Sequence, residues 1–142
     1  MPSTRPLHRQ PTALAAVFAG GVVGTAARYF LELAFPPAQG GWPWATFCIN
    51  LGGAALLGLI SAILVAGADD SPVRQRLRLF AATGCCGAFT TYSTFALEQT
   101  NLWRHGAPVV AVTYAAVSVA GGVLAAWAGF SLGNVVSAWS EQ

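Results

Sequence analysis

The sequence predicts an all-α membrane protein with four transmembrane helices. Of its 142 residues, 55% are hydrophobic and only 8% are charged, whereas soluble domains carry roughly 25% charged residues. Four apolar stretches, at about 14–33, 44–66, 79–103 and 109–136, are each near or above the ~20 residues that a helix needs to cross a bilayer. This length leaves room for one compact domain with almost no mass outside the membrane.

The predicted domain organisation is simple. A flexible N-terminal tail at 1–12 precedes a transmembrane domain at 13–137 and a C-terminal tail at 138–142. The arginines followed by an apolar run resemble a signal peptide, but Arg28-Tyr29 and the glycine pattern favour a retained helix. Because the connections are short, neighbouring helices are expected to run antiparallel.

The charges predict an orientation in the cell membrane, and they exclude one function class. All seven basic residues are arginines. If all four segments span the membrane, five of the arginines lie on one side: Arg5, Arg9, Arg74, Arg76 and Arg78. Arg104 lies on the other side. The positive-inside rule then places both termini in the cytoplasm, although Asp69 and Asp70 add nothing to this modest bias. No basic patch outside the membrane supports nucleic-acid binding.

Small residues in the segments indicate close helix packing. Gly20, Gly21, Gly24 and Ala27 form a stripe that lets helix backbones approach one another in lipid. The three cysteines lie inside predicted helices without neighbouring histidines: Cys48, Cys85 and Cys86. We therefore interpret them as small packing residues rather than metal ligands.

The segment 84–95 departs from the composition of a helix that only spans lipid. It combines Gly84 and Gly87 with the sequence Thr90-Thr91-Tyr92-Ser93-Thr94-Phe95. The glycines beside hydroxyl residues predict a break in the helix with a polar surface next to it. Non-helical backbone at membrane depth is tolerated only where it faces protein, ions or water. The segment therefore predicts a permeation or ion-binding site.

Two other segments carry polar groups at a similar depth. Thr46, Asn50, Gly53, Ala54, Leu57 and Ser61 recur at helical spacing and share one face. A buried amide such as that of Asn50 needs hydrogen-bond partners, which a neighbouring helix could supply without any pathway. Tyr114 and Ser118 lie one turn apart and could line a narrow polar path, although a serine in a membrane helix often bonds to its own backbone.

The hydroxyls and aromatic rings of the third segment suit a small anion. Tyr92 and Phe95 are i, i+3 neighbours and form an aromatic ridge, with Thr91, Ser93 and Thr94 on either side. The positive edges of aromatic rings, together with hydroxyl and amide donors, can stabilise an anion without a fixed charge that would prevent its exit. Carbonyls freed by the break could instead bind a small cation. Ordinary packing is the alternative for the two rings.

Two acidic residues lie within or near the spans. An acid inside the membrane is by default a functional candidate. Glu98 follows Phe95 by one turn and could pair with an arginine or cap a vestibule. Glu32 lies near the end of its helix, close to Arg28, and we interpret it as an interfacial residue.

Taken together, these residues resemble the fluoride channel family, called Fluc or CrcB. The resemblance extends from Gly20 to about Ser118. Three motifs carry it: Gly20-Gly21-x-x-Gly24-x-x-x-Arg28-Tyr29, Trp44-x-Thr46-x-x-x-Asn50-x-x-Gly53, and Gly84-x-x-Gly87-Ala88-x-Thr90-Thr91-Tyr92-Ser93-Thr94-Phe95-x-x-Glu98. The third motif is highly specific, whereas the glycines of the first are weak on their own.

The resemblance implies a fluoride-selective passive channel that exports cytoplasmic fluoride. Two copies would assemble in opposite orientations, with two pores and one Na⁺ held at the dimer centre by the backbone carbonyls of Gly87 and Thr90. No organic cofactor is implied. Arg28 and Glu98 would act in the vestibules, and the pore-lining residues would be Thr46, Asn50, Tyr92, Ser93, Thr94, Phe95, Tyr114 and Ser118.

The chain departs from the family pattern at two positions. Ala88 replaces a glycine and narrows the allowed backbone dihedrals there. Tyr92 replaces a phenylalanine and adds a hydroxyl that could serve as a donor or obstruct the path. The arginine bias also leaves two partners open, a second copy of this chain or an oppositely oriented relative.

Two other functions compete with the channel. A proton-coupled exporter of the small multidrug type would need an embedded carboxylate, but Glu32 lies too near the helix end and Glu98 lies beside donors suited to anions. A non-transporting assembly subunit would use Gly20, Gly24, Gly129 and Gly133 only for packing, and would leave Asn50 unexplained. Nothing forms a nucleophile–base pair, so we do not expect an enzyme.

Overall fold

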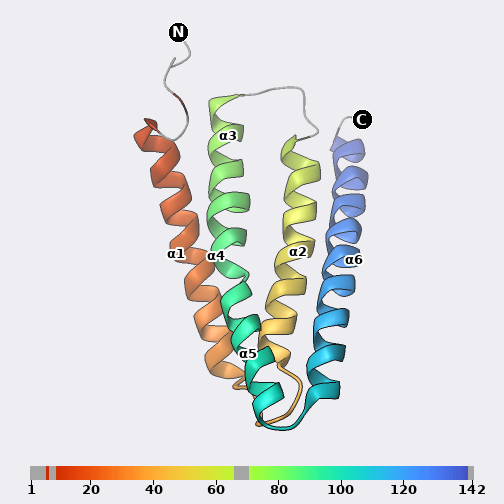
Figure 1. The fold of residues 1–142 in the computed structure, drawn as a ribbon. Helices are drawn as coiled ribbons and strands as arrows, with labels where there is room; N and C mark the ends of the chain where they lie inside the picture. The colour runs from red at the N-terminus through yellow and green to blue at the C-terminus, as the bar shows by residue number, and fades with distance from the viewer. Residues whose placement is uncertain (1–5, 7–8, 66–70, 141–142) are drawn as a thin grey trace.

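The computed structural model describes residues 6, 9–65 and 71–140. Arg5, His8, Asp69 and Asp70 lie outside the described residues, as do 141–142 of the predicted C-terminal tail. The described residues form helices and no strand, which confirms the all-α class. The elements are α1 (Pro11–Ala34), α2 (Trp44–Val65), α3 (Pro72–Arg78), the π-helix η2 (Leu79–Cys86), α4 (Gly87–Phe89), α5 (Tyr92–Arg104) and α6 (Pro108–Ser140). Figure 1 shows them as an elongated bundle.

Three helices, α1, α2 and α6, are long and apolar enough to cross a membrane. The third predicted segment, 79–103, differs from a single spanning helix. It begins earlier, at Pro72, where the Ser71 side chain caps the helix by accepting a hydrogen bond from the Arg74 N–H group at 3.3 Å. It is then divided into α3, η2, α4 and α5, which follow one another along the bundle. The apolar stretch used for the prediction did not include the first turns of this segment, Pro72–Arg78, because they carry three arginines.

The outer ends of the first and last helices also extend beyond the predicted bounds. α1 begins at Pro11 rather than 14, because proline is well suited to the first helical turn. α6 continues to Ser140 rather than 136, so part of the predicted C-terminal tail is helical.

The bundle consists of two tightly packed helix pairs. One pair is α1 against η2 and α4, where a Cβ atom added to Gly20 would overlap the carbonyl oxygen of Phe80. The other is α2 against α6, where a Cβ atom added to Gly58 would overlap the carbonyl oxygen of Ala126. The glycines thus allow direct backbone contact in both pairs, as the predicted packing stripe requires.

The two pairs meet closely at one end of the bundle. Leu102, Ala111 and Tyr114 are buried there, with Trp42 and Phe95 packed against them. After α5, Gly106 adopts a φ of 71°, a left-handed conformation that glycine takes readily, and the chain turns into α6. This arrangement holds α5 against α2 and α6 and leaves a groove between the pairs further along.

Candidate functional site

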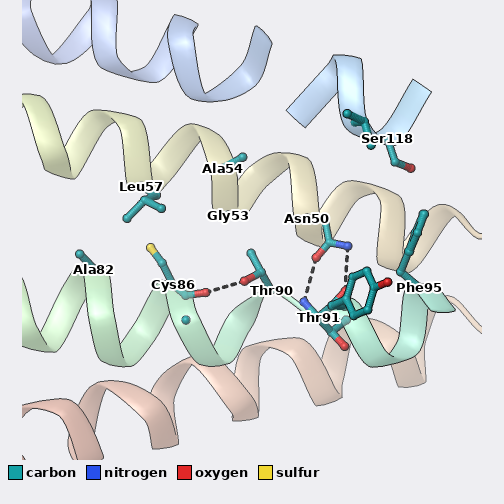
Figure 2. Close-up of a pocket in the computed structure, with 13 residues that line it drawn as sticks. Asn50, Gly53, Ala54, Leu57, Ala82, Cys86, Thr90, Thr91, Phe95 and Ser118 are labelled. Atoms are coloured by element: carbon teal, nitrogen blue, oxygen red, sulfur yellow. Dashed lines mark hydrogen bonds between the residues drawn. The ribbon is translucent and has the colours of Figure 1, made fainter. Parts of the chain in front are cut away.

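A groove of about 470 Å³ lies between α2, the η2–α5 segment and α6 (Figure 2). No charged side chain lines it. Asn50, Tyr92, Phe95 and Ser118 are predicted pathway residues that the structure brings together here. The remaining lining residues are Gly53, Ala54, Leu57, Ala82, Cys86, Gly87, Thr90, Thr91 and Val119.

The helix break lies at Thr90 and Thr91, not at the glycines. Thr90 has φ −75° and ψ 153°, and Thr91 has φ −142° and ψ 124°, so both are extended. Gly84 lies within η2 and Gly87 opens α4, so the predicted break is present within 84–95 but lies after the glycines rather than at them. Gly84 instead allows close packing, because a Cβ atom there would press on the Val17 carbonyl oxygen of α1. Because threonine is β-branched, it is more compatible with extended backbone than with helical backbone, which agrees with a break at these two residues.

Asn50 bridges α2 to the break through two reciprocal hydrogen bonds. Its Nδ2 donates to the Thr91 carbonyl oxygen at 3.0 Å, and the Thr91 N–H group donates to its Oδ1 at 2.9 Å (Figure 2). A break at membrane depth would otherwise leave these backbone groups unpaired, at a cost of about 1–3 kcal/mol each. Asn50 therefore both connects two helices and lines the groove.

Two backbone carbonyls at the break lose their ordinary helical donors. In a continuous α-helix the Thr91 N–H group would donate to the Gly87 carbonyl, and the Thr94 N–H group to the Thr90 carbonyl. Here the Thr91 N–H group bonds to Asn50, and the Thr94 N–H group donates to the Thr91 Oγ1 at 3.1 Å. These two carbonyls are the predicted Na⁺ ligands. Across the described ranges no cluster of His, Cys, Asp and Glu could hold a metal ion.

Hydroxyls and rings gather beside the break. The Thr91 Oγ1 lies 3.2 Å from the Ser93 Oγ and also donates to the Thr94 Oγ1 at 3.1 Å. The Tyr92 and Phe95 ring centroids are 6.2 Å apart, which matches the predicted aromatic ridge. Ser93 and Thr94 adjoin the groove without lining it.

Ser118 contributes an available hydroxyl to the groove from α6. Its Oγ is buried and has no hydrogen-bond partner among the described residues. It does not bond to its own backbone, which was the alternative considered from the sequence. A buried hydroxyl without a partner is costly unless water or a ligand satisfies it.

Two predicted pathway residues point elsewhere. Thr46 and Tyr114 are almost completely buried, at 1% and 0% exposure, and neither lines the groove. The Thr46 Oγ1 donates to Glu98 Oε1 at 2.7 Å, and the Tyr114 hydroxyl donates to Glu98 Oε2 at 2.9 Å. Glu98 thus has hydroxyl partners on both oxygens. These two partners were not predicted, because they lie on α2 and α6, far from Glu98 in the sequence. The one signal in the sequence is that all three residues are expected at a similar depth in the membrane.

Glu98 also borders a second, smaller cavity of about 130 Å³. This cavity lies under the connection between α1 and α2 and near the end of α5, with Gln39, Asn101 and His105 in its wall. Arg28 and Glu32, one turn apart on α1, are half-buried. The Arg28 Nε and a Glu32 carboxylate oxygen are buried without a hydrogen-bond partner in the described ranges.

Comparison with known proteins connects this geometry to one family. The family described as CrcB-like protein, Camphor Resistance (CrcB), matches residues 15–130. A curated relative from Chlorobium luteolum, named fluoride-specific ion channel FluC, is 42% identical over 84% of this chain and 90% of its own length. One from Cutibacterium acnes, named fluoride-specific ion channel FluC 1, is 39% identical over 85% of each chain. One from Streptomyces coelicolor with the same name is 31% identical over 99% of this chain and 90% of its own length.

Proposed function

Because the chain belongs to the CrcB-like family, we propose that this multi-pass cell membrane protein is a fluoride-selective channel. Fluoride passes through it passively, down its electrochemical gradient, and so leaves the cytoplasm. The observation that carries the proposal is the uncharged groove, which places the Asn50 amide, the aromatic ridge and the Ser118 hydroxyl around one break at membrane depth.

The groove supplies what a small, strongly hydrated anion requires. Donors must replace its water, and Asn50 keeps one amide hydrogen beyond the one that it donates to Thr91. The Ser118 hydroxyl, which has no partner among the described residues, adds a donor, and ring edges of Tyr92 and Phe95 add weaker stabilisation. The Ser93 and Thr94 hydroxyls adjoin the groove and could add donors at its edge. Without a fixed positive charge among the lining residues, the anion can also leave.

The proposed assembly is an antiparallel dimer with two pores. In a single chain the break is open to one side: Gly87 and Ser93 are exposed, and Tyr92 is 82% exposed. Irregular backbone with polar side chains does not face lipid, because its polar groups would remain unsatisfied. A protein surface must therefore cover it, and a second copy or an oppositely oriented relative supplies this cover. Each chain then contributes one groove.

A central Na⁺ fits the donors at the break. Carbonyl oxygens are hard ligands suited to small cations. The Gly87 and Thr90 carbonyls have lost their helical donors to Asn50 and Thr91, and Gly87 lies on the exposed side, where a second copy would meet it. These carbonyls from both copies would hold the ion, which would stabilise the dimer electrostatically. No organic cofactor is proposed.

Glu98 and Arg28 are assigned to the ends of the pathway. Glu98 borders the small cavity beside the connection of α1 and α2, and Thr46 and Tyr114 fix its orientation. The Arg28 Nε is buried and has no hydrogen-bond partner within the described ranges, and the positive charge of this side chain can attract an anion toward the groove. The multidrug-type exporter is disfavoured, because both Glu98 oxygens are already engaged by hydroxyl donors.

Ion efflux from proteoliposomes loaded with fluoride or chloride tests the proposal. We expect rapid fluoride efflux, little chloride efflux and no requirement for a proton gradient. Asn50→Ala should slow fluoride efflux, whereas Asn134→Ala, at an exposed position on α6 outside the groove, should not. Equal efflux of both anions, or fluoride efflux only with proton exchange, would exclude a selective passive channel.

A further inference from the structure

We propose that Asn50 and the Thr91 side chain are positioning residues that keep the Gly87 and Thr90 carbonyls available to a cation. Each does so by taking the N–H group that would otherwise bond to one of these carbonyls. The replacement of the two helical hydrogen bonds by bonds to the Asn50 and Thr91 side chains follows from the observed geometry and does not depend on a cation. Its consequence for a cation rests on the proposed Na⁺ site.

Asn50 controls the Gly87 carbonyl. The Thr91 N–H group can reach one of two acceptors, the Gly87 carbonyl if the helix continues or the Asn50 Oδ1 if the chain extends. The 2.9 Å bond to Oδ1 selects the extended form, and the 3.0 Å bond from Nδ2 to the Thr91 carbonyl reinforces it. An amide that both donates and accepts is the side-chain group that can satisfy both backbone partners.

Thr91 controls the Thr90 carbonyl in the same way. Its Oγ1 accepts from the Thr94 N–H group at 3.1 Å and so acts as the N-cap of α5. Thr91 is only 6% exposed, so water does not readily replace this hydroxyl. Without the Thr91 hydroxyl, the Thr94 N–H group would either donate to its helical acceptor, the Thr90 carbonyl, or remain unpaired.

The arrangement links the groove to the cation. Asn50 lines the groove, and the residue to which it is bonded, Thr91, directly follows Thr90 along the chain. A change at Asn50 should therefore weaken cation binding even though the Asn50 side chain does not itself bind the cation. By thermodynamic reciprocity, the cation should in turn stabilise the Asn50–Thr91 hydrogen bonds.

NMR of the full-length protein in bilayers tests this without measuring transport. The signals are hydrogen exchange of the Thr91 amide and the carbonyl ¹³C shifts of Gly87 and Thr90, during a titration with Na⁺ against N-methylglucamine. In Asn50→Ala we expect exchange at Thr91 to accelerate about tenfold, the Gly87 shift to change, and half-saturation to need about tenfold more Na⁺. In Thr91→Val the Thr90 shift should change instead.

Matched variants separate positioning from general destabilisation. Thr100→Val removes a hydroxyl that donates to the Ala96 carbonyl within α5, and should leave all three signals unchanged. Asn50→Asp keeps the shape of the side chain, and when protonated it both donates and accepts. The ionised carboxylate can still accept from the Thr91 N–H group but cannot donate to the Thr91 carbonyl, and protonation restores that donor. Lowering the pH should therefore move the Thr91 carbonyl ¹³C shift of this variant toward its native value. The native chain, which carries the same Cys86, Tyr92 and Glu98, is the control at each pH.

Two results would overturn the inference. Unchanged Gly87 and Thr90 shifts in the Asn50 and Thr91 variants would show that these side chains do not hold the carbonyls. Changed shifts with unchanged Na⁺ affinity would refute the link to the cation. Absence of fluoride efflux from the native chain would instead count against the proposed channel, and would leave the hydrogen-bond result intact.

Discussion

The hydroxyl of Tyr114 on α6 donates a hydrogen bond of 2.9 Å to a carboxylate oxygen of Glu98 on α5. Thr46 on α2 donates to the other oxygen, so a single carboxylate connects three helices. Both hydroxyl residues are buried, and aromatic side chains surround Tyr114: its ring lies 5.0 Å from that of Phe95 and 5.3 Å from that of Trp42. The position of α5, and of the groove wall that precedes it, therefore depends on this polar cluster.

Tyr114→Phe should destabilise the protein without emptying its core. The variant keeps the ring but leaves one Glu98 oxygen without its donor, which should cost about 1–3 kcal/mol. Thermal denaturation in detergent should show a lower midpoint. Tyr29→Phe, at a site that is 59% exposed on α1, serves as the control and should leave the midpoint unchanged. Equal midpoints for both variants would mean that the cluster contributes little.

Gly20→Ala should separate α1 from η2. The added methyl group would overlap the Phe80 carbonyl oxygen, and backbone cannot move aside cheaply, so we expect a loss of at least about 1–3 kcal/mol. The neighbouring Gly21→Ala is a matched control, because a Cβ atom there meets nothing within 4 Å. Folded yield and thermal stability measured side by side should differ, and a tolerated alanine at Gly20 would contradict the close packing.

Tyr92→Phe should alter conduction but not abolish it. The change removes the hydroxyl from a residue that lines the groove and lies 6.2 Å from Phe95 between ring centroids. If the hydroxyl is a donor along the path, its loss should lower the fluoride efflux rate or the fluoride-to-chloride ratio about two- to tenfold. If it obstructs the path, efflux should accelerate instead. Rates and selectivity identical to the parent would refute a role for this hydroxyl.

Ser118→Ala should reduce fluoride efflux with little effect on stability. Its buried hydroxyl has no partner among the described residues, so the variant breaks no hydrogen bond within that part of the protein. We expect efflux to fall about two- to tenfold, the effect of one lost donor. Ser131→Ala, on the same helix outside the groove, is the comparison. A large drop in thermal stability, with efflux per folded protein unchanged, would indicate a packing role instead.

Part of the groove lining could be predicted from the sequence. Asn50 and Ser118 stood out as polar groups within apolar helices, and the i, i+3 spacing of Tyr92 and Phe95 predicted their proximity. Thr46 and Asn50 are four residues apart and were predicted to share one helix face, but the Thr46 side chain donates a hydrogen bond to Glu98 instead of lining the groove. Helical periodicity gives the face of a residue and not the partner across from it, so this difference could not be predicted.

The all-α membrane class, the family and the glycine-based packing can be predicted from the amino-acid sequence, because they depend on composition, segment length and local spacing. The position of the break in the third segment and the hydroxyls that donate to Glu98 became known from the folded structure alone. Both outcomes depend on competition between acceptors on different helices. The Thr91 N–H group bonds to Asn50 rather than to Gly87 because α2 brings the amide within 2.9 Å, and local sequence does not encode that approach.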